Sequence, residues 1–582
     1  MSITLKINKT GLFFSRIIPV AAILFFAAIA VFCVFYLFTG YYHLINWFNG
    51  LNGCYYRHAY WTNDFFTGKT KVAGNIYCLI ALLLCFIGGG YSGRVLIGKQ
   101  KLNVISDKSA VSVPFTISVP SIDVALTGVL ILFTTILWFY GTSLVYPSND
   151  EVFSAVNCAS LHPFQTVVYY MLPNNHILFN LINNLFFHSF TDKVATGRFI
   201  SLVCYWGIAI ISFSWIRNLI HKKWLAFLVS VTLLLQFPVW GFATQARGYE
   251  LLLLLEWGAF VSLFRYFFTS QKRWLYITSA CCIAGYFTVP TFLYFHLAII
   301  LFTVFCQLKN KKAEFQFWKY QMAIIFIVFL LYLPCLCFSG MSAIIGNKYV
   351  APYPDNKEFI ADIIPVISNY LDYCFFNFIT SNHQFDGVLI LLPLVLFFYT
   401  KNKTAVILSR FYFSFWLAIL ILTFRMRIFP IDRALAGQFS ITLVIVIYTV
   451  YLLAGNIADQ LKIKILPCLI LCLFLLSLSF NFINNGRIHI NHYLCHFPVN
   501  AWHDLMEKGV KTLPNGSSAA FSDESFYLYY LSTQKGLQTN KCSKANEDYF
   551  INLNEPFPAG IAEHYEPYQT VGDFYIYKRK HK

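Results

Sequence analysis

The chain is dominated by long apolar runs separated by short polar connectors. Most runs have about 17 to 25 residues, the length needed to cross the hydrocarbon core of a bilayer as an α-helix. We count about thirteen predicted spans by this criterion, and the pattern predicts a mainly α, polytopic transmembrane fold. They cover residues 17–38, 74–90, 121–145, 199–216, 224–243, 250–264, 274–289, 291–307, 320–338, 387–400, 411–424, 434–454 and 465–482.

Composition agrees with this pattern. Of the 582 residues, 58% are hydrophobic and only 12% are charged, and the mean hydropathy is +0.60, which excludes a water-soluble globule. Most cysteines fall within predicted spans, where thiols act as small apolar fillers, and their spacing indicates no metal site. Cys495 and Cys542 lie beyond the last span and would pair only in an oxidising compartment.

The charge distribution predicts the topology. The net charge is +17, but the basic residues lie in short connectors and form no aromatic-interleaved patch, so nucleic acid is not an expected partner. With the N-terminus inside, cytoplasmic connectors carry about 22 basic residues against about 11 on the other side. We therefore expect an N-inside, C-outside protein whose first apolar run is a retained anchor.

Three parts are expected along the chain. Residues 1–120 form an N-terminal helical hairpin with a basic cytoplasmic connector, 121–482 a transmembrane catalytic core, and 483–582 an outer-face domain. The last part has short β-like stretches, Ala519–Phe521 and Phe574–Tyr577, among Pro, Gly and Asn turns. It is predicted to be a small α/β domain, with amphipathic loop helices elsewhere on the same face.

Asp150 and Glu151 form an acidic pair where the apolar run 121–145 ends. Ser148 and Glu151 have the spacing of a capping box, so the pair could simply begin a helix. One carboxylate suffices for capping, however, and ionisable groups beside membrane spans are costly to keep without a function. We interpret the pair as catalytic, a role that is compatible with capping.

The segment Asn174–Phe190 is predicted to be an amphipathic helix at the membrane surface. His176, Asn180 and Asn184 recur at i, i+4 and i+8, with apolar residues on the opposite face. This polar stripe either lines a cleft or faces water. His176 is a candidate substrate contact, with an ordinary structural hydrogen bond as the alternative.

Two arginines stand at outer ends of predicted spans, against the charge bias. Arg247 precedes the span 250–264 and Arg433 precedes the span 434–454. A guanidinium at the interface can bind a lipid-linked phosphate in a bidentate manner. The alternatives are snorkelling, or pairing with Glu250 and Asp432 respectively. Lys348 is a further candidate for phosphate binding.

These features, and the order in which they occur along the chain, resemble those of the C-type glycosyltransferase (GT-C) superfamily. The resemblance is specifically to relatives of protein O-mannosyltransferases and of the lipid A aminoarabinose transferase. The resemblance covers about residues 120–455. The segments that carry it are Asn149-Asp150-Glu151, Pro173-Asn174-Asn175-His176, Ala246-Arg247-Gly248-Tyr249 and Arg433.

This resemblance implies an enzyme that moves a sugar, hexosyl or pentosyl, from a polyprenyl-phosphate donor to a glycan, lipid or protein acceptor at the outer face. Asp150 would be the general base and Glu151 would orient the base or the acceptor. No cofactor is certain; a divalent metal, Mg or Mn, stays open, with Asp150, Glu151 and His176 as one ligand set. The residues implied at the substrate are His176, Arg247, Arg433, Lys348, Asn175 and Tyr249.

Two other functions remain open from the sequence. A lipid-linked oligosaccharide ligase or polymerase would also need outer-face arginines, but with its cleft in a late loop. A transporter would need charged residues deep within spans, where Glu256 is the main example. A bacterial inner membrane with periplasmic catalytic loops is the favoured location; the alternative is the endoplasmic reticulum, for which the sequon Asn515-Gly516-Ser517 would matter.

Overall fold

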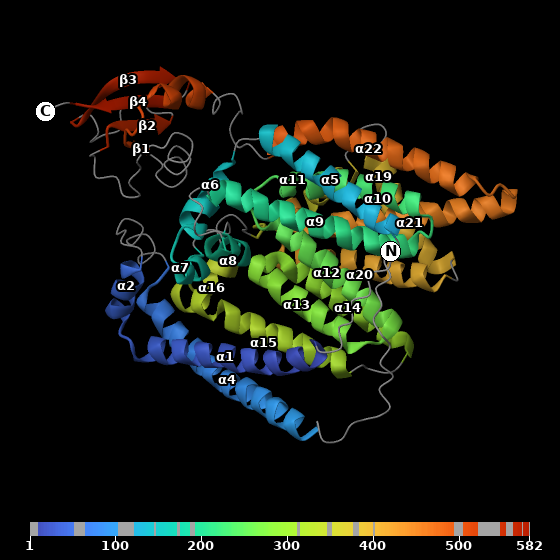
Figure 1. Cartoon of the computed structure of the whole chain (residues 1–582), viewed down its shortest axis with the longest axis horizontal. Helices are drawn as coiled ribbons and strands as arrows, with labels where there is room; N and C mark the ends of the chain where they lie inside the picture. The colour runs from blue at the N-terminus through green and yellow to red at the C-terminus, as the bar shows by residue number, and fades with distance from the viewer. Residues whose placement is uncertain are drawn as a thin grey trace. The chain divides into compact units, whose positions relative to one another are not determined.

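The structure is a computed structural model of the whole chain, shown in Figure 1. It describes residues 10–51, 65–102, 121–144, 147–170, 175–186, 193–310, 315–345, 352–375, 383–399, 402–493, 504–521, 547–553, 563–572 and 574–580. Within these residues the protein is mainly α-helical, with one small sheet near the C-terminus. The mainly α fold predicted from the apolar runs is therefore confirmed.

The chain divides into two compact units, and the smaller one comprises Met1–Val129, Val167–Met171 and Ile325–Ile345. Its longest helices pack against each other closely because Gly88 leaves no side chain between them; a Cβ there would lie 2.5 Å from the Phe26 ring. The Tyr36 hydroxyl donates to the Cys337 carbonyl across the unit, at 2.8 Å. Its helices are α1 (Thr10–Phe38), α2 (Tyr41–Gly50), α4 (Gly68–Leu102), most of α15 (Phe315–Phe338) and α16 (Met341–Ile345).

The larger unit holds the remaining helices and the sheet. The helices that lie wholly or mostly in it are α5 (Ser121–Leu144), α6 (Asn149–Ser154), α7 (Pro163–Val168), α8 (Ile177–Phe186), α9 (Lys193–Leu219), α10 (Lys223–Leu235), α11 (Phe237–Ala243), α12 (Tyr249–Thr269), α13 (Lys272–Thr288), α14 (Leu293–Asn310), α17 (Asn356–Ala361), α18 (Ile363–Phe375), α19 (His383–Tyr399), α20 (Lys403–Met426), α21 (Ala436–Leu461) and α22 (Leu466–Tyr493). Short turns include a π-helix (Ala155–Ala159) and the 3-10 turns Pro290–Phe292 and Asp432–Leu435.

The predicted spans all fall on helices, but fewer than thirteen qualify as membrane-spanning. Within the described residues, 10 helices are long and apolar enough, or up to 11 if α10 and α11, bent by 62°, form one broken span. The remaining two are shorter: α13 has 17 residues and begins with Lys272 and Arg273, and the apolar part of α19 covers only Asp386–Val395. The predicted count of thirteen is therefore reduced to 10 or 11 among the described residues, because α13 and α19 have only 17 residues each, the lower limit for a span, and carry charged residues in their first turns.

The C-terminal residues form the four-stranded sheet seen in Figure 1, with strand order β1-β2-β4-β3. β1 runs parallel to β2, and the other two pairs are antiparallel. The strands are β1 (Ala519–Phe521), β2 (Tyr549–Leu553), β3 (Tyr565–Val571) and β4 (Phe574–Arg579). Both predicted β segments are strands, while Cys495 and Cys542 lie outside the described residues.

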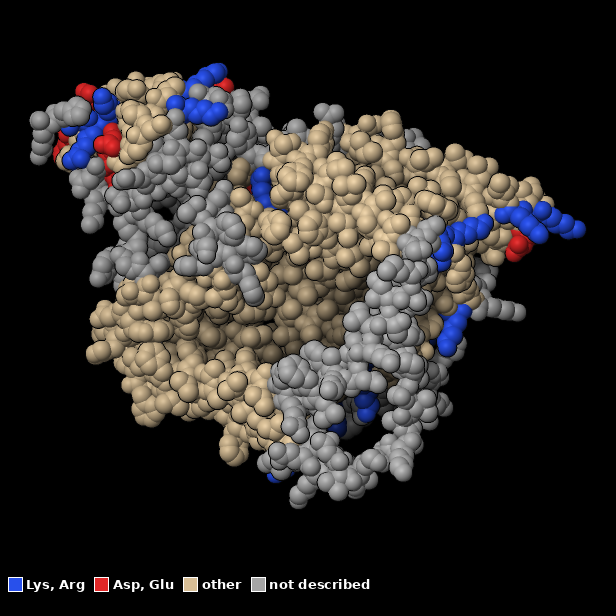
Figure 2. Space-filling view, viewed as in Figure 1, with Lys and Arg blue, Asp and Glu red and all other residues tan. Residues whose placement is uncertain are grey.

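Charged side chains are nearly absent from the helical part of the face in Figure 2, where the visible lysines and arginines lie at its edges. Inside the larger unit, Glu256 of α12 is 1% exposed and packs against the first turn of α21. A Cβ on Gly437 would lie 1.7 Å from its Oε2, so a larger residue there would force the Glu256 side chain to move. Glu256 thus faces a neighbouring helix and lies away from lipid.

Candidate functional site

The acidic pair begins helix α6, as the capping box predicted. Ser148 is extended and its side chain accepts from the Glu151 N–H, while the Glu151 carboxylate accepts from the Ser148 N–H at 2.8 Å. This reciprocal bonding satisfies two backbone donors that a helix start leaves open. Asp150 lies between these two residues, and its side chain takes no part in the box.

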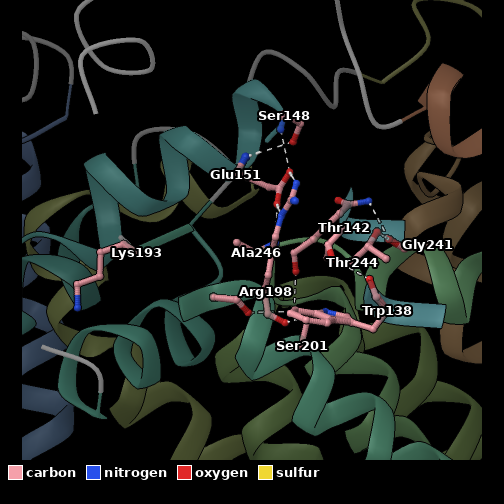
Figure 3. A network of polar contacts seen from close by, with 12 residues as sticks. Trp138, Thr142, Ser148, Glu151, Lys193, Arg198, Ser201, Gly241, Thr244 and Ala246 are labelled. Atoms are coloured by element: carbon pink, nitrogen blue, oxygen red, sulfur yellow. Dashed lines mark hydrogen bonds and ion pairs between the residues drawn. The ribbon is translucent and has the colours of Figure 1, made fainter. Parts of the chain in front are cut away.

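Glu151 is fully buried and also serves as a long-range anchor, shown in Figure 3. Its carboxylate accepts from Arg198 Nε at 2.9 Å, from Arg198 Nη2 at 3.2 Å and from the Ala246 N–H at 2.8 Å. With the Ser148 bond, its two oxygens accept four hydrogen bonds. Such a carboxylate is fixed in position and has little capacity left for substrate.

Helix α9 brings the segment before α12 to Glu151. Gly197 permits this approach, since a Cβ there would lie 2.7 Å from the Ala246 Cβ. The Ser201 hydroxyl donates to the Gln245 carbonyl at 2.6 Å, and Trp138 Nε1 donates to the Arg198 carbonyl at 3.2 Å. The neighbouring residue, Arg247, is therefore held next to α6.

Asp150 meets the two arginines singled out in the sequence. Its Oδ2 lies 2.6 Å from Arg247 Nη1 and 3.5 Å from Arg433 Nη1. The side chain of Arg247 is 3% exposed, that of Asp150 is 19% exposed and that of Arg433 is 33% exposed. Two guanidinium groups thus converge on one accessible carboxylate, and Arg247 pairs with Asp150 instead of the predicted alternative, Glu250.

Tyr249 lies beneath both arginines. The Arg247 Cζ is 4.9 Å and the Arg433 Cζ 5.8 Å from the centroid of the Tyr249 ring, within range of cation–π attraction. The His176 ring meets the Tyr249 ring edge-on at 4.6 Å. These contacts orient the guanidinium groups around Asp150.

His176 is buried and accepts the Gly248 N–H at Nδ1, 2.7 Å away. Burial, and then the charges of Arg247 and Arg433, lower its pKa well below the ordinary value, so the ring is neutral. With Nδ1 accepting, the proton resides on Nε2, which has no partner among the described residues. His176 therefore presents a neutral N–H donor.

The polar stripe of the predicted amphipathic helix is buried, so it does not face water. Asn180 and Asn184 of α8 are both buried. Asn184 Nδ2 donates to the carbonyls of Ala159 and Leu161, at 2.7 and 2.6 Å. Asn175 donates to the Thr166 carbonyl and accepts from Asn180, so its amide is engaged at both ends within the protein.

The structure brings together Asp150, His176, Arg247, Tyr249 and Arg433, which come from four separate segments of the sequence. Lys348, together with Pro173 and Asn174, lies outside the described residues. Arg198 was missed by sequence reasoning. The same signal could have found it, because it too is an arginine at the predicted outer end of a span.

The candidate metal ligands Asp150, Glu151 and His176 do not surround one common position. No group of three His, Cys, Asp or Glu side chains among the described residues is arranged to hold a metal ion. Asp150, Glu151 and His176 are therefore not such a set, and the Glu151 oxygens are already engaged by Arg198 and backbone donors. The described residues therefore do not fit the metal that the resemblance left open.

Gly248→Ala is expected to destabilise the site. The backbone of Gly248 has φ −73°, which any residue adopts, but a Cβ would lie 2.7 Å from His176 Cβ and 2.8 Å from its Nδ1. Overpacking of this kind costs about 1–3 kcal/mol. Gly455→Ala is the matched control, because its Cβ meets nothing within 4 Å in α21 and should be neutral or stabilising. Denaturant unfolding of both variants in detergent checks this, and equal stabilities would contradict it.

Comparison with known proteins found no matching family model and no matching curated protein. Two crystal structures of ArnT from Cupriavidus metallidurans are similar in fold. The structure bound to undecaprenyl phosphate has 10% identity and a TM-score of 0.45, covering 79% of this chain and 98% of that one. The apo structure has 11% identity and a TM-score of 0.46, covering 78% and 98% respectively.

Proposed function

We propose that this chain is an integral-membrane glycosyltransferase that moves a sugar from a polyprenyl-phosphate donor to an acceptor at the non-cytoplasmic face. The observation that carries the proposal is the convergence of Arg247 and Arg433 on Asp150, around the face of Tyr249. Two guanidinium groups at the end of membrane helices form an anion site, and a carboxylate beside them supplies a base.

In the proposed reaction an acceptor hydroxyl attacks the anomeric carbon of the donor sugar. The bond from that carbon to the phosphate oxygen breaks, and the hydroxyl proton passes to Asp150. Arg247 and Arg433 stabilise the charge that grows on the leaving polyprenyl phosphate. The neutral Nε2–H of His176 is a further donor for a phosphate or sugar oxygen.

An apolar groove, lined by residues that precede Arg433 in the sequence, would receive the prenyl tail of the donor. It has a volume of about 450 Å³ and lies between α18, α19 and α20. The hydroxyl of Tyr370, one of its lining residues, donates to the carbonyl of Pro430 at 2.6 Å, three residues before Arg433. Its lining includes Tyr370, Leu391, Trp416, Leu420, Phe424 and Phe429. A groove of this lining buries apolar chain and cannot bind a polar sugar well.

Arg433→Ala is expected to weaken donor binding without unfolding the protein. Loss of a charged hydrogen bond of about 1.5–3 kcal/mol corresponds to a Kd increase of about 10- to 100-fold. Binding of undecaprenyl phosphate to purified protein measures this effect. Arg425→Ala is the control, since Arg425 is an exposed arginine in the last turn of α20. Unchanged affinity in Arg433→Ala would remove the phosphate role from this residue.

The location in the cell is part of the proposal. We propose a bacterial inner membrane with α6 and the sheet domain on the periplasmic side. Asn515 is exposed in a turn next to Gly516, whose φ is +80°. A glycan on Asn515 of the natively expressed protein would place it in the endoplasmic reticulum instead.

A further inference from the structure

We propose that Asp150 competes with the donor phosphate for Arg247 and Arg433, so that donor binding must precede activation of the acceptor. This inference rests on the function proposed above, because it concerns the same anion site and the same base. It adds an order of binding and an inhibitory contact within the resting protein.

The competition follows from the way one oxygen is held. Asp150 Oδ2 contacts Nη1 of Arg247 at 2.6 Å and Nη1 of Arg433 at 3.5 Å, which is the bridging position that a phosphate oxygen would take. A carboxylate oxygen between two guanidinium groups is also a poor proton acceptor, since protonation would give up both ion pairs. The resting site is thus closed to the anion and weak as a base for the same reason.

The surroundings determine which group can change partner. Glu151, the next residue, is fixed by four hydrogen bonds, so the backbone of α6 is held in place. Arg247 and Arg433 both lie on the Tyr249 ring, and Arg247 is nearly fully buried. Arg433 is the most exposed of the three side chains, whereas Arg247 is held by burial, so rotation of the more exposed Asp150 about Cα–Cβ is the movement that releases Arg247.

An incoming phosphate then does two things at once. Its oxygens replace Asp150 Oδ2 on the guanidinium groups. The released carboxylate accepts the proton of the acceptor hydroxyl as the hydroxyl oxygen bonds to the anomeric carbon and the bond from that carbon to the phosphate oxygen breaks. When polyprenyl phosphate leaves and Asp150 loses the proton to solvent, the ion pairs form again. The cycle predicts that the acceptor reacts only after the donor is bound.

Asp150→Asn should therefore bind the donor phosphate more tightly, although it cannot transfer sugar. If the ion pairs leave the arginines available about a tenth of the time, freeing them raises affinity about tenfold. The experiment measures the Kd of undecaprenyl phosphate for purified wild-type, Asp150→Asn and Asp432→Asn proteins in nanodiscs. Asp432→Asn is the matched control. Asp432 Oδ1 accepts the backbone N–H of Arg433 at 2.7 Å, and the substitution should leave the Kd of undecaprenyl phosphate unchanged.

The outcomes separate this inference from the proposed function. If wild-type protein binds no undecaprenyl phosphate, the proposed donor class fails. If wild-type protein binds it and Asp150→Asn binds equally or less tightly, the competition is wrong and the donor class stands. Equal tightening in both variants would mean a general charge effect and would also overturn the competition. If Asp150→Asn binds undecaprenyl phosphate more weakly, and EDTA weakens binding to the wild-type protein in the same way, Asp150 is a metal ligand.

A second measurement on the wild-type protein covers the case in which Asp150→Asn does not fold. The methyl diester of undecaprenyl phosphate keeps one negative charge as the pH changes. Among the described residues, the charged groups paired with Asp150 are Arg247 and Arg433, and the charge of Asp150 also acts on His176, whose pKa is lowered mainly by burial. Affinity for the diester should rise as acid protonates Asp150, and a flat profile would overturn the competition.

Discussion

Asp150→Asn is expected to lower sugar transfer by about 10²–10⁴-fold, the usual contribution of a general base. An asparagine side chain has the same shape, but its neutral oxygen holds Arg247 more weakly than a carboxylate does, and it cannot take a proton. The fold should therefore persist while the chemical step fails. The measurement is single-turnover transfer from a polyprenyl-phosphate sugar to a panel of acceptors, with undecaprenyl phosphate binding as a test of the folded site.

Asp432→Asn provides the control for transfer as well, because it removes a carboxylate next to Arg433 whose Oδ1 accepts the backbone N–H of Arg433, a bond that asparagine can keep. Full activity of Asp150→Asn would refute the assignment of the base. That result would favour a lipid-linked oligosaccharide ligase or polymerase, whose cleft would not depend on an early acidic loop. Loss of activity in both variants would show only that the site tolerates no charge change.

Glu151→Ala is expected to lower the free energy of unfolding by about 3–5 kcal/mol, because it leaves the buried Arg198 guanidinium without its partner. The variant also leaves the N–H groups of Ser148 and Ala246 without an acceptor. Unfolding in mixed micelles, followed by tryptophan fluorescence, measures the loss. Low expression together with a lower unfolding midpoint is the expected result.

The double variant Glu151→Leu with Arg198→Met tests whether the unpaired Arg198 causes the loss of stability in Glu151→Ala. Replacing both members of a buried ion pair by apolar residues is often close to neutral, so the double variant should recover much of the lost stability. Stability of Glu151→Ala equal to that of the wild type would contradict the anchoring role. Activity lost per folded molecule, with stability unchanged, would make Glu151 a catalytic residue.

Substitutions of the adjacent carboxylates Asp150 and Glu151 thus have different expected effects, because the two side chains have different surroundings. Glu151 points into the protein, where Arg198 and backbone donors saturate it. Asp150 points to an accessible site where two arginines hold it on one oxygen. Sequence spacing identified the pair but assigned catalysis to both residues, because periodicity does not reveal which side chain finds a buried partner.

Arg247 and Arg433 were recognisable because they stand at span ends that the charge bias predicts to be poor in basic residues. The residues with which these arginines pair were not recognisable from the sequence. Arg247 has a carboxylate three residues away, Glu250, yet it pairs with Asp150, 97 positions earlier. At a helix start, three residues of separation allow contact on one face, but packing of α6 against the segment before α12 decided the actual pair.

The sequence by itself determined the membrane helices, the capping box of α6, the small C-terminal sheet and the set of polar residues available for chemistry. These depend on the local length, period and chemistry of neighbouring residues. Only the tertiary structure decided that Asp150 meets Arg433 across 283 positions, that Arg198 saturates Glu151 and that the asparagines of α8 are buried. Contacts between distant segments depend on how the helices pack, including close approaches at glycines such as Gly197, and no local pattern specifies them.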